Sequence, residues 1–120
     1  MQVLFESRDP AGAPLRDLAV RRVRFVMRRM TWLVPRVRVQ LSDTNGPRGG
    51  VDKRCQVELR THTGGQVVIT TIHRDWRSAL DQALARAARA LLRTWHRLQV
   101  RREPHAKAAA PMRPLRLSGD

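Results

Sequence analysis

Five residues of the sequence could ligate a metal ion through sulfur or imidazole nitrogen: Cys55, His62, His73, His96 and His105. None of them forms the short Cys/His pairing that zinc sites use. Cys55 lies in a stretch where apolar and polar residues alternate, and a small core residue is the usual role there. The sequence therefore predicts no metal site.

Two aspartates, Asp75 and Asp81, are the next candidates for chemistry. At a separation of six residues they fall on different faces of a helix, so they do not form the paired carboxylates of an acid–base site. We expect Asp75 to cap a helix and Asp81 to be solvated or hydrogen-bonded. The sequence also has no glycine-rich phosphate loop, nucleophile elbow or dinucleotide fingerprint. We therefore expect a protein that is not an enzyme, with no cofactor and no small-molecule substrate.

The most abundant group that could bind a ligand is the guanidinium group of arginine. The chain of 120 residues has 24 Lys+Arg against 10 Asp+Glu, a formal net charge of +14, and only Lys53 and Lys107 are lysines. Arginine binds phosphate through two parallel hydrogen bonds. This charge predicts a polyanionic partner, nucleic acid before an anionic membrane.

The arginines are concentrated in two stretches that lack acidic residues. Seven lie between Asp17 and Asp43, and six lie between Asp81 and Glu103. In the second stretch four of them recur at helical spacing and form one stripe: Arg86, Arg89, Arg93 and Arg97. Like charges at this spacing repel each other, and a phosphate backbone would relieve the repulsion. The alternative interpretation is a solvated helix face that only keeps the protein soluble.

The elements that position these residues follow from periodicity. Residues 2–7 predict a strand, followed by a turn at 8–12. A helix is predicted from Pro14 until just before Pro35, with apolar residues at helical spacing. Residues 36–41 and 54–60 alternate as half-buried strands around a loop at 42–52.

The last two predicted elements are a strand and a helix. Gly64-Gly65 predicts a tight hairpin turn, and residues 66–72 form the returning strand. After Asp75 a second helix carries one broad apolar side, made of Ala79, Leu80, Ala83, Leu84, Ala87, Leu91 and Leu98. The order β-α-β-β-β-α predicts an α+β fold, in which a four-stranded antiparallel sheet carries two helices on one face.

The predicted domain covers residues 1–102, and residues 103–120 form a basic tail without periodicity, expected to be disordered. With a single cysteine, no signal peptide at its start and no apolar run long enough to span a membrane, the chain is expected in the cytoplasm.

Two segments resemble a known family. The strand DKRCQVEL (52–59) and the segment HRDWRSALDQALARAARALLR (73–93) are similar to the ribosome hibernation-promoting factor and ribosome-associated inhibitor family. Leu15-Arg16-Asp17-Leu18, followed by Arg22, resembles the start of the family's first helix. The resemblance covers about residues 1–100. Arg77 stands where the family usually has Tyr, and Ala87 and Ala90 replace larger residues.

The resemblance implies a fold similar to a double-stranded-RNA-binding domain and a short-form member without the C-terminal dimerisation domain. It implies a monomer that binds rRNA in the mRNA–tRNA channel of the small ribosomal subunit and blocks translation in resting or stressed cells. Carried over from the family, the RNA-binding residues are Arg16, Arg22, Lys53, Arg86, Arg89 and Arg93. The charge pattern alone adds Arg28, Arg29 and Arg97.

Two other functions use the same charge. A general RNA-binding protein or RNA chaperone needs the arginine stripe but no fit to a ribosomal channel. A basic amphipathic protein at a membrane surface needs bulky apolar residues where the second helix has alanines. The sequence thus favours RNA over a membrane.

Overall fold

The computed structural model describes residues 1–44, 52–107, 115–116 and 118–119, with side chains through residue 97. The chain divides into two compact units, Met1–Arg89 and Ala90–Asp120. The first unit contains β1 (Gln2–Ser7), the 3-10 helix η1 (Pro10–Leu15), α1 (Arg16–Val26), β2 (Arg36–Asp43), β3 (Lys53–Arg60) and β4 (Gln66–His73). The long helix α2 (Trp76–Lys107) begins in the first unit and continues into the second. The second unit also holds the two-residue strands β5 (Leu115–Arg116) and β6 (Ser118–Gly119).

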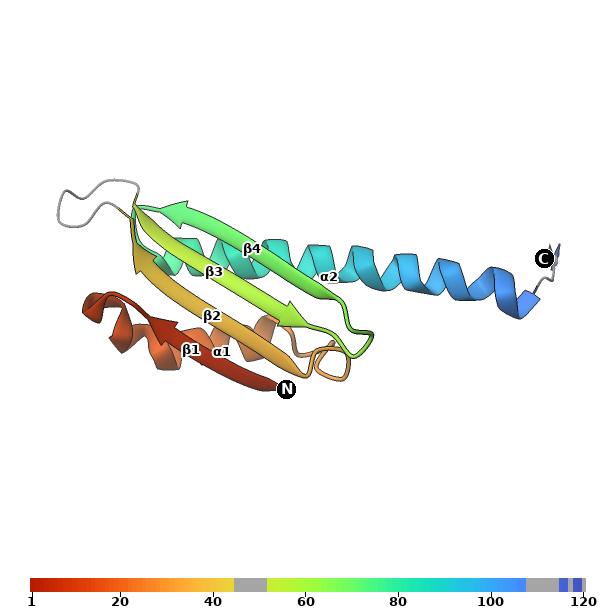
Figure 1. The fold of residues 1–120 in the computed structure, drawn as a ribbon, viewed down its shortest axis with the longest axis horizontal. Coiled ribbons are helices and arrows are strands. Elements are labelled where there is room, and N and C mark those ends of the chain that lie inside the picture. The colour runs from red at the N-terminus through yellow and green to blue at the C-terminus, as the bar shows by residue number, and fades with distance from the viewer. Residues whose placement is uncertain (45–51, 108–114, 117, 120) are drawn as a thin grey trace. The chain divides into compact units, whose positions relative to one another are not determined.

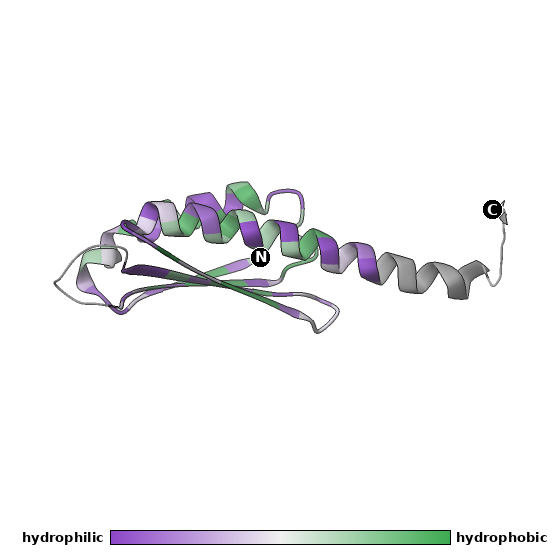
Figure 2. Cartoon of the chain, turned by 90° about the horizontal axis from the view of Figure 1, so that it is seen from above, coloured by the Kyte–Doolittle hydropathy of each residue, from purple (hydrophilic) through white to green (hydrophobic). Residues whose placement is uncertain are grey.

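The four long strands form one sheet in the order β1-β2-β3-β4 (Figure 1). The helices of the first unit lie on the same side of this sheet (Figure 2). The predicted α+β class, with four strands and two helices on one face, is therefore confirmed. The prediction of an antiparallel sheet is wrong for one pair of strands, because β1 and β2 are parallel. The chain crosses over through α1 between them, and a crossover returns the second strand in the direction of the first.

The first helix is shorter than predicted. It ends at Val26 and is followed by turns in which Arg28 N donates to Phe25 O (3.3 Å) and Met30 N to Met27 O (2.8 Å). These turns bury Leu33 and Val34 just before β2 begins. The burial of this pair outweighs the helical periodicity that predicted a continuous helix as far as Pro35.

Alternation along the strands builds the core. Val37, Val39 and Leu41 of β2 and Cys55, Val57 and Leu59 of β3 are buried beneath the helices. The helices contribute small residues to this core, including Ala19, Ala79, Ala83 and Ala87. Small side chains let a helix approach a sheet closely. Charged residues one or two positions away in sequence lie on the opposite side of the helix, at the surface. The predicted apolar side of α2 is confirmed through Leu91, whereas the Leu98 side chain lies outside the described residues.

Capping and turn chemistry fix the ends of the elements as predicted. Asp75 accepts a hydrogen bond from the Ser78 backbone N–H (2.7 Å) in the first turn of α2, which confirms the predicted cap. Gly64 has a φ of 87° in the β3–β4 turn, a conformation that favours glycine.

At its C-terminal end α2 runs to Lys107, past residue 103 where the tail was expected to begin. The domain boundary after residue 102 stays a prediction.

Candidate RNA-binding surface

The candidate surface is formed by exposed arginines on α1, in the turns that follow α1, and on α2. Alternating burial along α1 explains their placement, because Ala19, Val23 and Met27 face the core at intervals of four residues. The positions on the opposite side of this segment face solvent, and five of them carry exposed arginines: Arg16, Arg21, Arg24, Arg28 and Arg29. Three of the predicted contact residues, Arg16, Arg28 and Arg29, are therefore available to a partner.

The second helix presents its arginines in the same way. Ala83, Leu84 and Ala87 are buried, and Arg86 and Arg89 project from the exposed side in the first unit. Arg93 and Arg97, in the part of α2 that belongs to the second unit, are also exposed. Arg97 donates a hydrogen bond of 3.4 Å to the Thr94 hydroxyl. All four arginines of the stripe identified in the sequence are exposed.

An ion pair links the two helices. The Arg22 guanidinium group lies 2.6 Å from Oδ1 of Asp81, and the two side chains are 44% and 49% exposed. Asp81 is thus the hydrogen-bonded carboxylate expected from the sequence. In the free protein Arg22 already has an anionic partner, so a phosphate must compete with Asp81 for it.

Arg28 has a different neighbour. Its guanidinium carbon lies 4.2 Å from the centre of the Phe25 ring, and it donates a hydrogen bond of 2.7 Å to the Phe25 carbonyl. Phe25 itself is 63% exposed. The cation–π contact holds the guanidinium group of the exposed Arg28 against the Phe25 ring.

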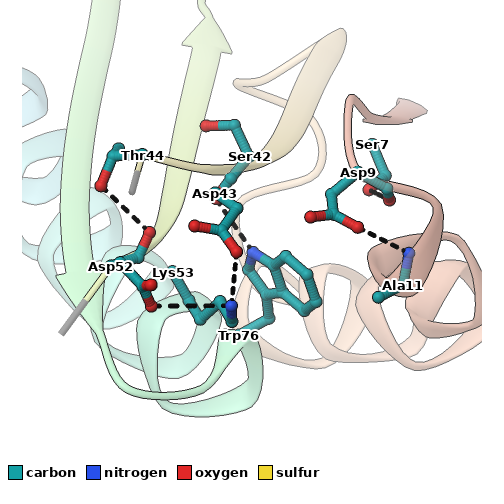
Figure 3. Close-up of polar contacts among 9 residues, drawn as sticks. All are labelled: Ser7, Asp9, Ala11, Ser42, Asp43, Thr44, Asp52, Lys53 and Trp76. Carbon is teal, nitrogen blue, oxygen red and sulfur yellow. Dashed lines mark hydrogen bonds and ion pairs between the residues drawn. The ribbon is translucent and has the colours of Figure 1, made fainter. Parts of the chain in front are cut away.

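Lys53 is engaged inside the fold (Figure 3). Its ammonium group lies 2.6 Å from Asp43 Oδ2 and 3.6 Å from Asp52 Oδ1, and 5.1 Å from the centre of the Trp76 ring. The hydrogen bond to Asp43 is the main reason that the pKa of Lys53 is raised. The Trp76 indole N–H also donates to the Ser42 carbonyl (3.2 Å), so this group joins the ends of β2 and β3 to the start of α2. Lys53 has a structural role in the free protein, and its contact with RNA stays a prediction.

The residues considered for other chemistry are placed as follows. Cys55 is buried, and desolvation raises the pKa of its thiol to about 12. Within the described ranges, no three His, Cys, Asp or Glu side chains come together in a way that could hold a metal ion. Among those same residues, no helix combines the length and apolarity of a bilayer span.

The sequence interpretation missed a second set of arginines on the sheet. Arg36 of β2 and Arg60 of β3 are exposed and stand directly opposite each other in the antiparallel register. Alternation with Val37 and Leu59 indicates that each side chain points away from the core. Their opposition depends on the register of the hairpin, which the loop at 42–52 does not specify.

These features define a small α+β domain whose sheet is covered on one face by two arginine-rich helices. No family model matches the sequence, and no curated protein matches it. The structure is similar to the N-terminal domain of Thermus thermophilus Protein Y, with a TM-score of 0.60 and 20% identity over 78% of this chain and 99% of that chain. It is also similar to a ribosomal subunit interface protein from Coxiella burnetii, with a TM-score of 0.64 and 11% identity over 80% of this chain and 99% of that chain. The fold implied by the sequence resemblance is thereby confirmed.

Proposed function

We propose that this protein binds the small ribosomal subunit through rRNA and blocks translation in resting or stressed cells, as a short-form member of the hibernation-promoting factor family. The observation that carries the proposal is the exposure of arginines on both helices of a fold shared with a ribosomal subunit interface protein. In this proposal the protein acts as a cytoplasmic monomer, needs no cofactor and catalyses no reaction. Its ribosome-binding domain covers residues 1–102, and residues 103–120 form a basic tail.

The mechanism follows from the chemistry of the helices. Guanidinium groups on α1 and α2 bind phosphate oxygens and release the counterions of the RNA. Because such contacts go to the backbone, recognition depends on the shape of the RNA more than on its bases. A rigid domain held in the mRNA–tRNA channel then excludes mRNA and tRNA by occupying their space. The contact residues of this proposal are Arg16, Arg22, Arg28, Arg29, Lys53, Arg86, Arg89, Arg93 and Arg97.

A charge reversal on α2 tests the proposal. In the variant R89E/R93E both exposed phosphate contacts become repulsive, and the fold stays intact because neither side chain is buried. We expect the variant to stay at the top of a sucrose gradient on which the wild-type protein co-sediments with the small subunit. The slope of log affinity against log salt should also fall by about two, since each phosphate contact contributes about 0.9.

The matched control is R8E/R74E, which makes the same change of charge at two exposed arginines outside α1 and α2. It should co-sediment almost normally and still inhibit in-vitro translation. If R89E/R93E co-sediments as well as the control, the α2 surface is not the contact surface. If the wild-type protein binds ribosomes, duplex RNA and DNA equally and leaves translation unchanged, the general RNA-binding alternative replaces the proposal.

A further inference from the structure

The helices cover one face of the sheet (Figure 2), and the strand registers place a row of hydrogen-bond donors on the other face. The strand registers pair Gln2 with Arg36, Arg36 with Arg60, and Arg60 with Gln66. All four side chains are exposed, so each strand contributes one polar side chain to a single line across the sheet. The two central members of this line are cations. We call these four residues the sheet row.

The charges of the sheet row are uncompensated within the described residues. No carboxylate lies within ion-pairing distance of Arg36 or Arg60 there. Cβ atoms of directly opposed residues lie about 5 Å apart, and like charges at that distance destabilise a sheet. The free protein therefore gains no stability from this pair.

The neighbouring row shows that the sheet can compensate such charges. It pairs Leu4 with Arg38, Arg38 with Glu58, and Glu58 with Val68. Arg38 lies 2.9 Å from Glu6 Oε1, and this hydrogen bond is the main reason that the pKa of Arg38 is raised. Acids thus stand beside Arg38 in one row, whereas the sheet row itself contains no acid. Glu58 of the neighbouring row lines the same surface as Arg36 and Arg60 but forms no ion pair with either of them in the described part of the chain. The contrast is what a site for an external anion requires.

The surface is hollowed on both sides of the two arginines. One hollow of about 380 Å³ is lined by Gln2, Pro35, Arg36, Arg60 and Thr61. Another of about 130 Å³ is lined by Leu4, Arg38 and Glu58 together with the same two arginines. The Thr61 hydroxyl lies 3.1 Å from the Gly65 carbonyl and 2.9 Å from the Thr63 hydroxyl. The donors that remain for a ligand are the guanidinium groups and the Gln2 amide.

We propose that Arg36 and Arg60 form a phosphate-binding site for the RNA backbone on the outer face of the sheet. Two guanidinium groups facing one hollow can each donate two parallel hydrogen bonds, a geometry that suits the oxygens of a phosphodiester. The net charge of +14 favours a polyanion as the source of that phosphate. This inference rests on the proposed function only in naming RNA as the partner that supplies the phosphate. It lies on the opposite face from the helices, so the domain contacts RNA from both faces.

The test compares two double variants of equal charge. R36Q/R60Q removes the proposed site, and R54Q/R74Q removes two arginines that line neither hollow. Binding of each to a short duplex RNA is measured over a series of salt concentrations. We expect the slope of log affinity against log salt to fall by about two for R36Q/R60Q and to change little for R54Q/R74Q. Equal slopes for the two variants would overturn the site.

Two further measurements distinguish a phosphate site for RNA from a general basic surface and from a site for acidic protein. Inorganic phosphate should shift the NMR signals of the Arg36 and Arg60 side chains more than that of Arg54, and equal shifts contradict the site. Polyglutamate should bind wild type and R36Q/R60Q alike, whereas a selective loss would assign the pair to an acidic protein instead of RNA. The duplex and phosphate assays contain no ribosome. Failure of the protein to bind ribosomes would therefore refute the proposed function without deciding the fate of this site.

Discussion

The ion pair between Arg22 and Asp81 leads to a prediction about competition. Arg22 is a proposed RNA contact, and its guanidinium group lies 2.6 Å from the Asp81 carboxylate in the free protein. Replacing Asp81 with Asn removes the competing anion without shortening the side chain. We therefore expect D81N to bind RNA more tightly than the wild-type protein, and to be slightly less stable.

The solvent exposure of the Arg22–Asp81 pair determines how much it contributes to stability and how much D81N should change RNA affinity. Side chains that are 44% and 49% exposed are well screened by water, so the pair contributes only about 0.5 kcal/mol to folding, within the usual range for surface pairs. Releasing Arg22 from a contact of that size increases RNA affinity about twofold, because 1.4 kcal/mol corresponds to a factor of ten.

The assay is a double-mutant cycle with R22Q, D81N and R22Q/D81N, measured by denaturant unfolding and by RNA binding at several salt concentrations. D17N is the matched control, because Asp17 is exposed on α1 and its replacement changes the net charge equally. The gain in affinity should exceed that of D17N and should vanish in R22Q/D81N. If D81N and D17N gain equally, the change in net charge accounts for the effect and Arg22 does not contact RNA.

Three other predictions concern stability and reactivity. The buried Cys55 thiol, with a pKa raised to about 12, should react with a thiol reagent at pH 8 only as fast as the protein opens, and native protein that reacts as fast as unfolded protein would contradict its burial. The thiol ionises near pH 9 in the unfolded chain but only near pH 12 in the folded protein. The stabilising effect of its burial is therefore complete below pH 9 and is lost between about pH 9 and 12. The variant C55A should not show this loss of stability. The backbone hydrogen bond from Ser78 is the main reason that the pKa of Asp75 is lowered, so its stabilising effect is present above about pH 4 and is lost at lower pH, and D75A should have a lower and less acid-dependent unfolding midpoint. At Gly64, whose φ is 87°, replacement with Ala should cost about 1 kcal/mol in the free energy of unfolding, and an unchanged urea midpoint would show that the turn relaxes.

Local patterns in the sequence predicted most of the elements. Strict alternation around Val39 and Val57 predicted β2 and β3, because side chains of period two bury one face. Asp75 predicted the start of α2, because a carboxylate satisfies the free N–H groups of a first turn. Where nonlocal burial competed with periodicity, the prediction failed, and α1 ended at Val26.

The residues of the candidate surface also differ in whether the sequence predicted their placement. Exposure of Arg86 and Arg89 followed from the sequence, since the positions of Ala83 and Ala87 fix the buried side of the helix. The engagement of Lys53 with Asp43 did not follow, because this contact forms only when the β2–β3 hairpin closes.

The sequence by itself therefore determined most of the helices and strands and the excess of arginine, because each depends on residues close together in the chain. Only the tertiary structure decided which charges are paired. It joined Arg22 to Asp81 across 59 residues and placed Arg36 opposite Arg60. Pairing of this kind depends on the packing of helices and on strand register, which local periodicity does not encode.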